Sequence, residues 1–363
     1  MKKTLMIGLA ASVLTACGVE PADEESSETN GQNQGDANDS TDTNESEMDE
    51  NVVADSLNSP WAMQMHEESW FITDRDGNLV MIQDGEVSAQ TLNISEEIVQ
   101  QGESGLLGFV LHPDFENNQQ AFLYHTYQDN DGLKNRVIQV VRKEDVWEEE
   151  MELLGDIPGA PTHNGGRLAI FEDELYVTTG DAEDPPLSQE VDSLAGKILK
   201  MTFDGSIPDS MPMENSYVWS YGHRNPQGLA WLEDGTMYSS EHGQTALDEI
   251  NLIEPGNNYG WPDYEGDETS DDTEAPFIHS GDDTWAPSGL VASGDQLYMA
   301  GLRGEAVYEV DITQEEIDTL IEGYGRIRDV HVIDQRLYFL TNNTDGRGNP
   351  DDTDDKLIEV ELN

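Results

Sequence analysis

The run Leu175-Tyr176-Val177-Thr178-Thr179-Gly180 is a short apolar and aromatic segment closed by a glycine, and its pattern recurs five more times along the chain. Runs of this kind, rich in aromatic and β-branched residues and bounded by turn residues, predict β-strands. The aromatic positions that we align are Phe71, Phe122, Tyr176, Tyr238, Tyr298 and Tyr338. Their spacings of 51, 54, 62, 60 and 40 residues each leave room for four short strands. The sequence therefore predicts an all-β fold, a six-bladed β-propeller of four-stranded antiparallel blades.

Residues 51–363 are predicted to form this propeller as one domain. The segment is long for a single domain, but no linker-like composition interrupts it and the repetition accounts for its length. A β-sandwich does not predict six near-equal modules. Three short segments, 95–101, 188–195 and 313–321, carry helix signals, the last with Thr313 as its cap. The functional loops are expected at one end of the propeller axis.

Acidic residues dominate the composition, with 76 Asp and Glu against 17 Lys and Arg and a formal net charge of −59. Without Lys2 and Lys3, which lie in the N-terminal segment described next, 15 basic residues remain against the same 76 acids, a net charge of −61. Such a surface repels phosphate backbones and anionic lipid headgroups, so binding to nucleic acid and electrostatic docking on membranes are disfavoured. An anionic partner can bind only where the few cations converge. A surface of this kind suits a salty or alkaline habitat.

Residues 1–17 have the layout of an export signal, with two lysines, an apolar run from Leu5 to Val13 and a Leu14-Thr15-Ala16-Cys17 ending. The ending resembles the lipobox of bacterial lipoproteins, whose cysteine becomes the lipidated first residue; the alternative is an ordinary cleaved signal with an incidental cysteine. Cys17 is the only cysteine, so no disulfide framework is expected. Residues 18–50, acidic and polar without Lys or Arg, predict a disordered tether. We expect an exported protein at the outer face of the cytoplasmic membrane of a bacterium, held there by its lipid anchor alone.

The stretch Tyr221-Gly222-His223-Arg224-Asn225-Pro226-Gln227-Gly228 contains too many backbone-breaking residues for the middle of a strand or helix and predicts a loop. The guanidinium of Arg224 offers a rigid fork of donors that suits carboxylate or quinone oxygens. The alternative is a turn whose Arg and Asn cap neighbouring backbone. His163, between a threonine and Asn164-Gly165-Gly166, lies on another open loop, where a histidine is either a general base or a turn residue that bonds backbone.

Four glycine-punctuated stretches hold most of the unusual polar residues, namely 102–108, 162–168, 221–228 and 325–330. In this order they resemble the soluble glucose/sorbosone dehydrogenase family, the pyrroloquinoline-quinone-dependent aldose sugar dehydrogenases. The resemblance runs from about residue 58 to residue 360. It implies a six-bladed propeller, in agreement with the repeat count.

The resemblance also implies residue roles. His163 would be the base that takes the proton from the sugar C1 hydroxyl while hydride passes to the quinone, and Asp181 would orient its imidazole. Arg224 and Asn225 would lie near the quinone oxygens, with Arg224 stabilising the negative charge that develops there. The remaining cofactor contacts are assigned to Glu103, Gln227, Arg303, Arg326 and Arg328.

Pyrroloquinoline quinone carries three carboxylates, so an acidic protein needs a local cationic cluster to hold it. Arg303, Arg326 and Arg328 are expected to supply that cluster. Arg326 and Arg328 are two residues apart, so on a strand both would project to one face; the alternative is a pair that faces solvent acids. Glu103 stands where some family members have Gln, and an acid there is a less favourable neighbour for an anionic cofactor.

Calcium suits oxygen-rich loops because it takes carboxylates and backbone carbonyls with flexible coordination. By resemblance, one Ca²⁺ would bridge the cofactor and the carbonyls of Gly243 and Gln244, and a second would be held by Glu249, Tyr259 and a neighbouring acid such as Asp267. The aspartate-rich segment 345–355 lacks the spacing of an EF-hand and is interpreted as a solvated loop.

These observations predict a quinoprotein that oxidises the C1 hydroxyl of aldoses to lactones and passes electrons to an unidentified external acceptor. A non-redox propeller that binds carbohydrate and a calcium-dependent lactonase on the same fold are the alternatives. The lactonase needs a metal held by side chains at the axis, which the arginines disfavour. A homodimer is one option for the assembly.

Overall fold

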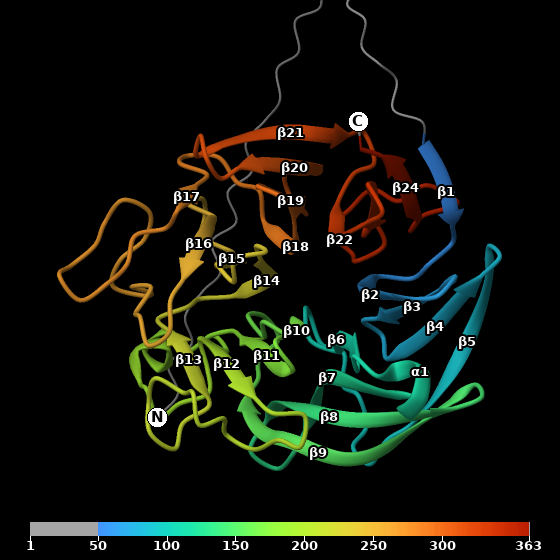
Figure 1. Ribbon diagram of the computed structural model, residues 1–363, viewed down its shortest axis with the longest axis horizontal. Coiled ribbons are helices and arrows are strands. Elements are labelled where there is room, and N and C mark those ends of the chain that lie inside the picture. Colours follow the sequence, from blue (N-terminus) through green and yellow to red (C-terminus); the bar gives the residue numbers. More distant parts are fainter. Residues whose placement is uncertain (1–49, 363) are drawn as a thin grey trace, which may run out of the picture. The chain divides into compact units, whose positions relative to one another are not determined.

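The computed structural model describes residues 50–362, which form a ring of six β-sheet blades around a central axis (Figure 1). The all-β, six-bladed propeller predicted from the repeats is therefore confirmed. The predicted signal segment with Cys17, and residues 18–49 of the predicted tether, lie outside the described residues. Between residues 50 and 362, no helix is both long and apolar enough to cross a membrane.

Each blade is an antiparallel meander of four strands. Blade 1 contains β2 (Pro60–His66), β3 (Ser69–Asp74), β4 (Asn78–Gln83) and β5 (Glu86–Asn93). Blade 2 contains β6 (Leu106–Leu111), β7 (Gln120–Gln128), β8 (Leu133–Lys143) and β9 (Val146–Pro158). Blade 3 contains β10 (Leu168–Phe171), β11 (Glu174–Thr179), β12 (Lys197–Met201) and β13 (Val218–Tyr221). Blade 4 contains β14 (Pro226–Trp231), β15 (Met237–Glu241), β16 (Glu249–Ile253) and β17 (Ile278–His279). Blade 5 contains β18 (Pro287–Ser293), β19 (Gln296–Gly301), β20 (Ala306–Asp311) and β21 (Glu316–Glu322). Blade 6 contains β22 (Ile327–Ile333), β23 (Arg336–Thr341), β24 (Leu357–Glu361) and β1 (Glu50–Ala54).

The six aligned aromatic residues all lie on the second strand of a blade, at its second or third position. These strands are sandwiched within their blades, so their aromatic and β-branched side chains pack against the neighbouring sheets. Phe71, Phe109 and Trp147 show this packing, because Trp147 meets both phenylalanine rings edge to face with centroids 5.5 and 5.4 Å apart. The repeat recognised in the sequence is thus the buried second strand of each blade.

Two strand pairings complete the ring. β1 pairs antiparallel with β24, so the first described strand completes the last blade and joins the two ends of the ring (Figure 1). β5 and β9 pair in parallel over Thr91–Asn93 and Val146–Glu148, which merges blades 1 and 2 into one eight-stranded sheet. Both pairings cover strand edges that would otherwise be open.

The three helix predictions were wrong. Segment 95–101 is irregular, and near 188–195 there is only a 3₁₀ turn at Pro185–Gln189. Segment 313–321 forms most of β21, because the Asp311 carboxylate accepts hydrogen bonds from the backbone N–H groups of Thr313 and Gln314 and so builds a hairpin turn after β20. A short helix, α1 (Phe115–Asn118), was not foreseen.

The innermost strands are β2, β6, β10, β14, β18 and β22, which surround the axis in Figure 1. Five of these six strands have a bulge or register shift near their first residues, at Pro60/Ala62, Leu106/Phe109, Pro226/Gly228, Pro287/Leu290 and Ile327/Asp329. Bulges re-aim side chains and break the alternation of faces. The same end of the ring carries the loops that precede the innermost strands and the loops that follow the second strands.

Buried polar contacts cross the hub. Arg167 Nη1 lies 3.1 Å from Asp329 Oδ1, both side chains are buried, and Arg167 Nε donates to the carbonyl oxygen of Gln227 at 2.8 Å. Asp329 also accepts a hydrogen bond from the backbone N–H of Met63. The Arg167 guanidinium lies 4.5 Å from the centroid of the Trp61 ring. These contacts join the innermost strands of four blades across the axis.

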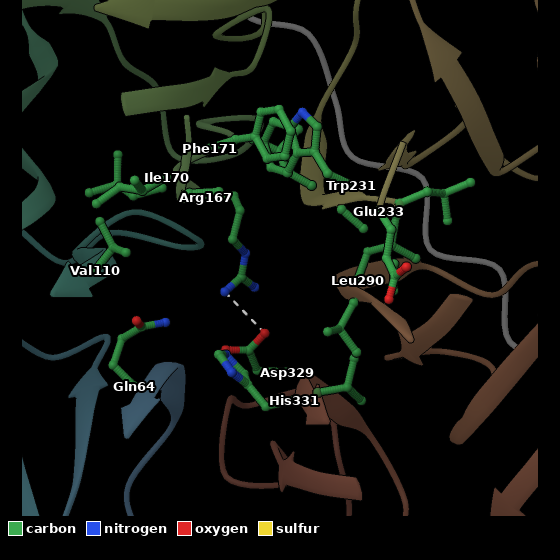
Figure 2. Close-up of a pocket in the computed structure, with 18 residues that line it drawn as sticks. Gln64, Val110, Arg167, Ile170, Phe171, Trp231, Glu233, Leu290, Asp329 and His331 are labelled. Carbon is green, nitrogen blue, oxygen red and sulfur yellow. Dashed lines mark ion pairs between the residues drawn. The ribbon is translucent and has the colours of Figure 1, made fainter. Parts of the chain in front are cut away.

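A cavity of about 520 Å³ lies on the side of the Arg167–Asp329 pair that faces away from the loops preceding the innermost strands (Figure 2). It is lined by the second halves of innermost strands, with Val110, Ile170 and Leu290 on its walls and the Arg167–Asp329 pair at its centre. At one margin the rings of Phe171 and Trp231 are stacked, with centroids 5.2 Å apart. The residues predicted for catalysis lie at the opposite end of these strands.

Changing Asp329→Ala leaves Arg167 buried without its carboxylate, and we expect the free energy of unfolding to fall by about 3–5 kcal/mol. Urea unfolding checks this. Glu359→Ala is the matched control, because it removes one acid from an ion pair with Arg336, whose side chain is 52% exposed, and should cost at most about 1 kcal/mol. Equal destabilisation by the two variants would contradict the importance of the hub pair.

Candidate active site

His163 and Asp181 form a hydrogen-bonded pair, with 2.8 Å between His163 Nδ1 and Asp181 Oδ1. Asp181 is fully buried and also accepts hydrogen bonds from Trp261 Nε1 (2.9 Å) and from the backbone N–H of Glu183 (2.9 Å). A carboxylate that accepts three hydrogen bonds favours the tautomer in which His163 Nδ1 carries the proton. The lone pair of Nε2 is then free, on a side chain that is 20% exposed.

Glycines allow the two loops of this pair to touch. A Cβ on Gly180 would lie 2.0 Å from the carbonyl oxygen of His163, and one on Gly165 would lie 2.6 Å from that of Thr178. His163 itself has a φ of 56°, in the left-handed region. The glycines in segments 163–166 and 178–181 therefore allow His163 to lie against Asp181.

The loop that carries Arg224 is fixed by Glu241, the last residue of β15. One oxygen of the Glu241 carboxylate accepts the backbone N–H groups of Arg224 and Asn225, and the other lies 2.8 Å from His223 Nδ1. The Arg224 carbonyl accepts the N–H of Asp181, so this loop directly adjoins the His163–Asp181 pair. The Arg224 guanidinium packs 5.2 Å from the centroid of the Trp261 ring, which donates to Asp181.

A small cavity next to His163 is lined by Asn164, Gly165, Gln227, Glu103 and three arginines, Arg75, Arg328 and Arg347. Arg328 is buried and donates to Gln227 Oε1 at 2.9 Å, to Asn342 Oδ1 at 3.0 Å and to Ser288 Oγ at 3.3 Å. Burial, together with the charges of Arg75 and Arg326, lowers the pKa of Arg328 to about 9. Positive charge is therefore concentrated at this end of the hub.

Arg326 and Arg303 lie differently from our expectation. Arg326 binds Asp345 Oδ2 through Nε (3.1 Å) and Nη2 (2.8 Å), so its charge is already paired. Arg326 precedes β22 and Arg328 lies at the bulge within it. Both side chains are buried, and both of their charges lower the pKa of Asp345. Arg303 is exposed on the turn after β19, and among the described residues its side chain makes no hydrogen bond.

The residues predicted to bind calcium are only partly assembled. Glu249 and Tyr259 line a second small cavity with Glu241, Glu265 and Gly243. Burial and the neighbouring Glu241 raise the pKa of Glu249 to about 8.

Asp267 does not join this group. Its side chain is 97% exposed and faces His279 at 3.2 Å, because the chain turns at Gly266, whose N–H donates to Glu249. Glu265 takes its place, accepting a hydrogen bond from the backbone N–H of Gln244. Within residues 50–362, no three His, Cys, Asp or Glu side chains form a metal cluster by themselves.

The interpretation of segment 345–355 as a solvated loop was wrong for its two ends. Asp345 is bound by Arg326, and Asp355 is fully buried, accepting hydrogen bonds from Thr341 Oγ1 and the N–H of Asn343. The same segment carries Arg347 into the site. Arg347, Arg75 and Glu241 were not predicted from the sequence. They share one signal, because each lies at the end of a blade's second strand or in the loop that follows it, as Asp181 does.

An anionic cofactor suits the groups present here. Three buried polar atoms at this end have no hydrogen-bond partner among the described residues, namely Arg75 Nε, Arg224 Nε and His242 Nε2. Burial lowers the pKa of His242 to about 4, so its imidazole is neutral. The cavities between these residues hold about 20 and 10 Å³, enough for single water molecules, so a ring-sized ligand would lie over these residues and not between them.

Comparison with known proteins identifies the family and supports the fold. Residues 57–349 match the model of the family described as Glucose / Sorbosone dehydrogenase. The chain belongs to this family. It is 34% identical over 254 residues to quinoprotein glucose dehydrogenase B of Acinetobacter calcoaceticus, a match that covers 60% of this chain and 53% of that protein, about half its length. It is 29% identical to the aldose sugar dehydrogenase YliI of Escherichia coli, over 81% of this chain and 90% of that protein.

Solved structures in this family superimpose closely. The pyrroloquinoline-quinone-bound form of an aldose sugar dehydrogenase from Streptomyces coelicolor has a TM-score of 0.80 and 35% identity, covering 86% of this chain and 96% of that one. The apo form of the soluble aldose sugar dehydrogenase from E. coli has a TM-score of 0.75 and 27% identity, covering 87% of this chain and all of that one.

Glu241→Gln should destabilise the Arg224 loop. A neutral amide has one acceptor oxygen where the carboxylate has two, and it accepts weaker hydrogen bonds than a charged carboxylate. The contacts to the Arg224 and Asn225 N–H groups and to His223 Nδ1 would therefore weaken, and we expect a loss of about 1–3 kcal/mol in unfolding free energy with faster amide exchange at Arg224 and Asn225. Hydrogen exchange followed by mass spectrometry measures the local effect. Glu233→Gln, at an exposed position on the β14–β15 hairpin, is the control. Unchanged exchange at the Arg224 loop in Glu241→Gln would show that another contact holds it.

Proposed function

We propose that this chain is a quinoprotein that oxidises the C1 hydroxyl of aldose sugars to lactones, with pyrroloquinoline quinone as the hydride acceptor. The observation that carries the proposal is the His163–Asp181 pair beside an arginine-lined cavity in a strongly acidic protein. The names of the A. calcoaceticus, E. coli and S. coelicolor relatives, which are glucose or aldose sugar dehydrogenases, support it.

His163 acts as the general base in this proposal. Its Nε2 accepts the proton of the C1 hydroxyl, and the positive charge that develops on the imidazole is stabilised by Asp181 through the 2.8 Å contact at Nδ1. Trp261 and the N–H of Glu183 hold the Asp181 carboxylate in place, so the imidazole needs little reorganisation when it becomes charged.

The arginines hold the cofactor and act on its charge. When bound, pyrroloquinoline quinone supplies an electrophilic quinone that accepts hydride. Arg328 and Arg224, with Asn225 and Gln227 beside them, would hold the cofactor through their donors, and Arg224 would stabilise negative charge near it. The free donor atoms of Arg75 and Arg224 fit an acceptor-rich ligand at this place.

Calcium is proposed at two places nearby. Glu249, in the cavity that Tyr259 also lines, would provide a carboxylate for a structural ion, and the carbonyls of Gly243 and Gln244 would provide oxygens for a second ion. Among residues 50–362, no hydrogen bond is donated to either of these two carbonyls. Export, lipid anchoring through Cys17, an external electron acceptor and a homodimer remain proposals from the sequence.

Reconstitution tests the catalytic assignment. Apoprotein given pyrroloquinoline quinone and Ca²⁺ should reduce a redox dye in the presence of aldoses. Changing His163→Ala should lower kcat by about a hundredfold or more, the usual contribution of a general base. Asp267→Asn, at an exposed carboxylate, is the control. A His163→Ala enzyme as fast as the parent would show that the base is misassigned.

Calcium should also stabilise the apoprotein. A site of dissociation constant Kd that binds only the folded state contributes about 2.7 kcal/mol at a Ca²⁺ concentration of 100 Kd, which raises Tm. Glu249→Gln should abolish most of this rise and Asp267→Asn should leave it intact. Equal responses to Ca²⁺ in both variants and the parent would exclude Glu249 as a ligand.

A further inference from the structure

The arginine cluster at the site, formed by Arg75, Arg326, Arg328 and Arg347, carries more positive charge than the carboxylates beside it neutralise. Only two carboxylates make ion pairs with it within residues 50–362, Asp345 with Arg326 and Glu103 with Arg347. Four guanidinium groups thus face two carboxylates, in a protein with 76 acids. Since acids are abundant everywhere else, this local excess marks a place for an anionic ligand.

The two ion pairs differ in how firmly they are held. The Arg326–Asp345 pair has two hydrogen bonds, from Nε and Nη2 to one carboxylate oxygen, and both side chains are at least nine-tenths buried. The Glu103–Arg347 pair is a single contact of 2.6 Å between Arg347 Nη1 and Glu103 Oε1, and the Arg347 side chain is 55% exposed. An ion pair with so exposed a partner contributes little to stability, so it can be exchanged at small cost.

Arg75 and Arg328 form a fixed floor beside this exchangeable pair. Arg75 Nη2 donates to the backbone carbonyl of Asp345 at 3.0 Å and its buried Nε has no partner among the described residues. Arg328 contacts only neutral oxygens. Glu103 and Arg347 line the same cavity as these two arginines, so Glu103 occupies the acceptor position that a ligand carboxylate would take.

We propose that the Glu103–Arg347 ion pair is an internal substitute for a ligand carboxylate, and that the anionic cofactor displaces Glu103 from Arg347 when it binds over Arg75 and Arg328. No covalent bond changes in this exchange. Arg347 moves from an internal acid to the ligand, and Glu103 keeps its hydrogen bond from the backbone N–H of His163 (3.3 Å). The acid at position 103 therefore weakens cofactor binding in this chain, and Arg347 compensates for it. This inference rests on the proposed function for the identity of the ligand.

A binding experiment tests the exchange without any activity measurement. Full-length apoprotein with Ca²⁺ is titrated with pyrroloquinoline quinone by isothermal calorimetry, in the parent, Glu103→Gln, Arg347→Met and the double variant. Glu103→Gln should tighten binding about tenfold and Arg347→Met should weaken it about tenfold, as for close charge pairs. The factor by which Arg347→Met raises Kd should be at least about threefold larger in the Glu103→Gln background, because Arg347 has no internal ion pair to break there.

Arg336→Met is the control for losing an exposed, paired arginine on the same blade, and its Kd should equal that of the parent. The proposal is overturned if Arg347→Met leaves Kd unchanged, or if its effect is the same with Glu103 and with Gln at that position.

A second probe separates this inference from the cofactor assignment. Benzene-1,3,5-tricarboxylate is a rigid aromatic tricarboxylate without a quinone, and its binding is followed by the rise in Tm. If pyrroloquinoline quinone does not bind but the tricarboxylate stabilises the parent and not Arg347→Met, the exchange stands and the proposed function fails. If neither anion binds the parent, both are overturned.

Discussion

The structure depends on a small set of buried cations that an acidic chain gathers at the hub of the ring. Arg167 and Asp329 neutralise each other across the axis, while Arg328, the residue next to Asp329, projects toward the site and finds only neutral oxygens. The bulge between Ile327 and Asp329 allows Arg328 to face the site while Asp329 pairs with Arg167 at the axis. One ion pair therefore stabilises the ring, and the adjacent charge remains available to a ligand.

The same logic connects the fold to catalysis. The ends of second strands and the loops that follow them bring Asp181, Glu241 and Arg347 to one end of the ring, and loops that precede innermost strands bring Glu103, His163 and Arg224 to meet them. His163 contacts Asp181 at 2.8 Å in this way, and Glu241 holds the Arg224 backbone. The rigid blades hold both sets of loops, so the site is assembled before any ligand arrives.

The sequence alone predicted the blades because the repeated aromatic runs are the second strands, whose burial imposes a strong pattern. It also placed His163, Asp181 and Arg224 at one site through motif order. It did not reveal the bulges, since these depend on pairing between strands and leave no periodic signal. The contacts of Arg347 and Asp355 were missed because an acidic loop resembles solvated chain until its partners are known. Residues 313–321 form mostly strand and not the predicted helix, because pairing with β20 outweighs their local helix propensity.

We propose that an aromatic tricarboxylate binds where guanidinium groups converge beside an imidazole, at one end of a ring of acidic blades. The most direct measurement is a crystal structure of the protein grown with pyrroloquinoline quinone and Ca²⁺. The proposed function predicts density for the cofactor over Arg75 and Arg328, with its carboxylates in contact with guanidinium groups and its ring facing His163. Density in the hub cavity on the far side of the Arg167–Asp329 pair, with none at the arginine cluster, would contradict it.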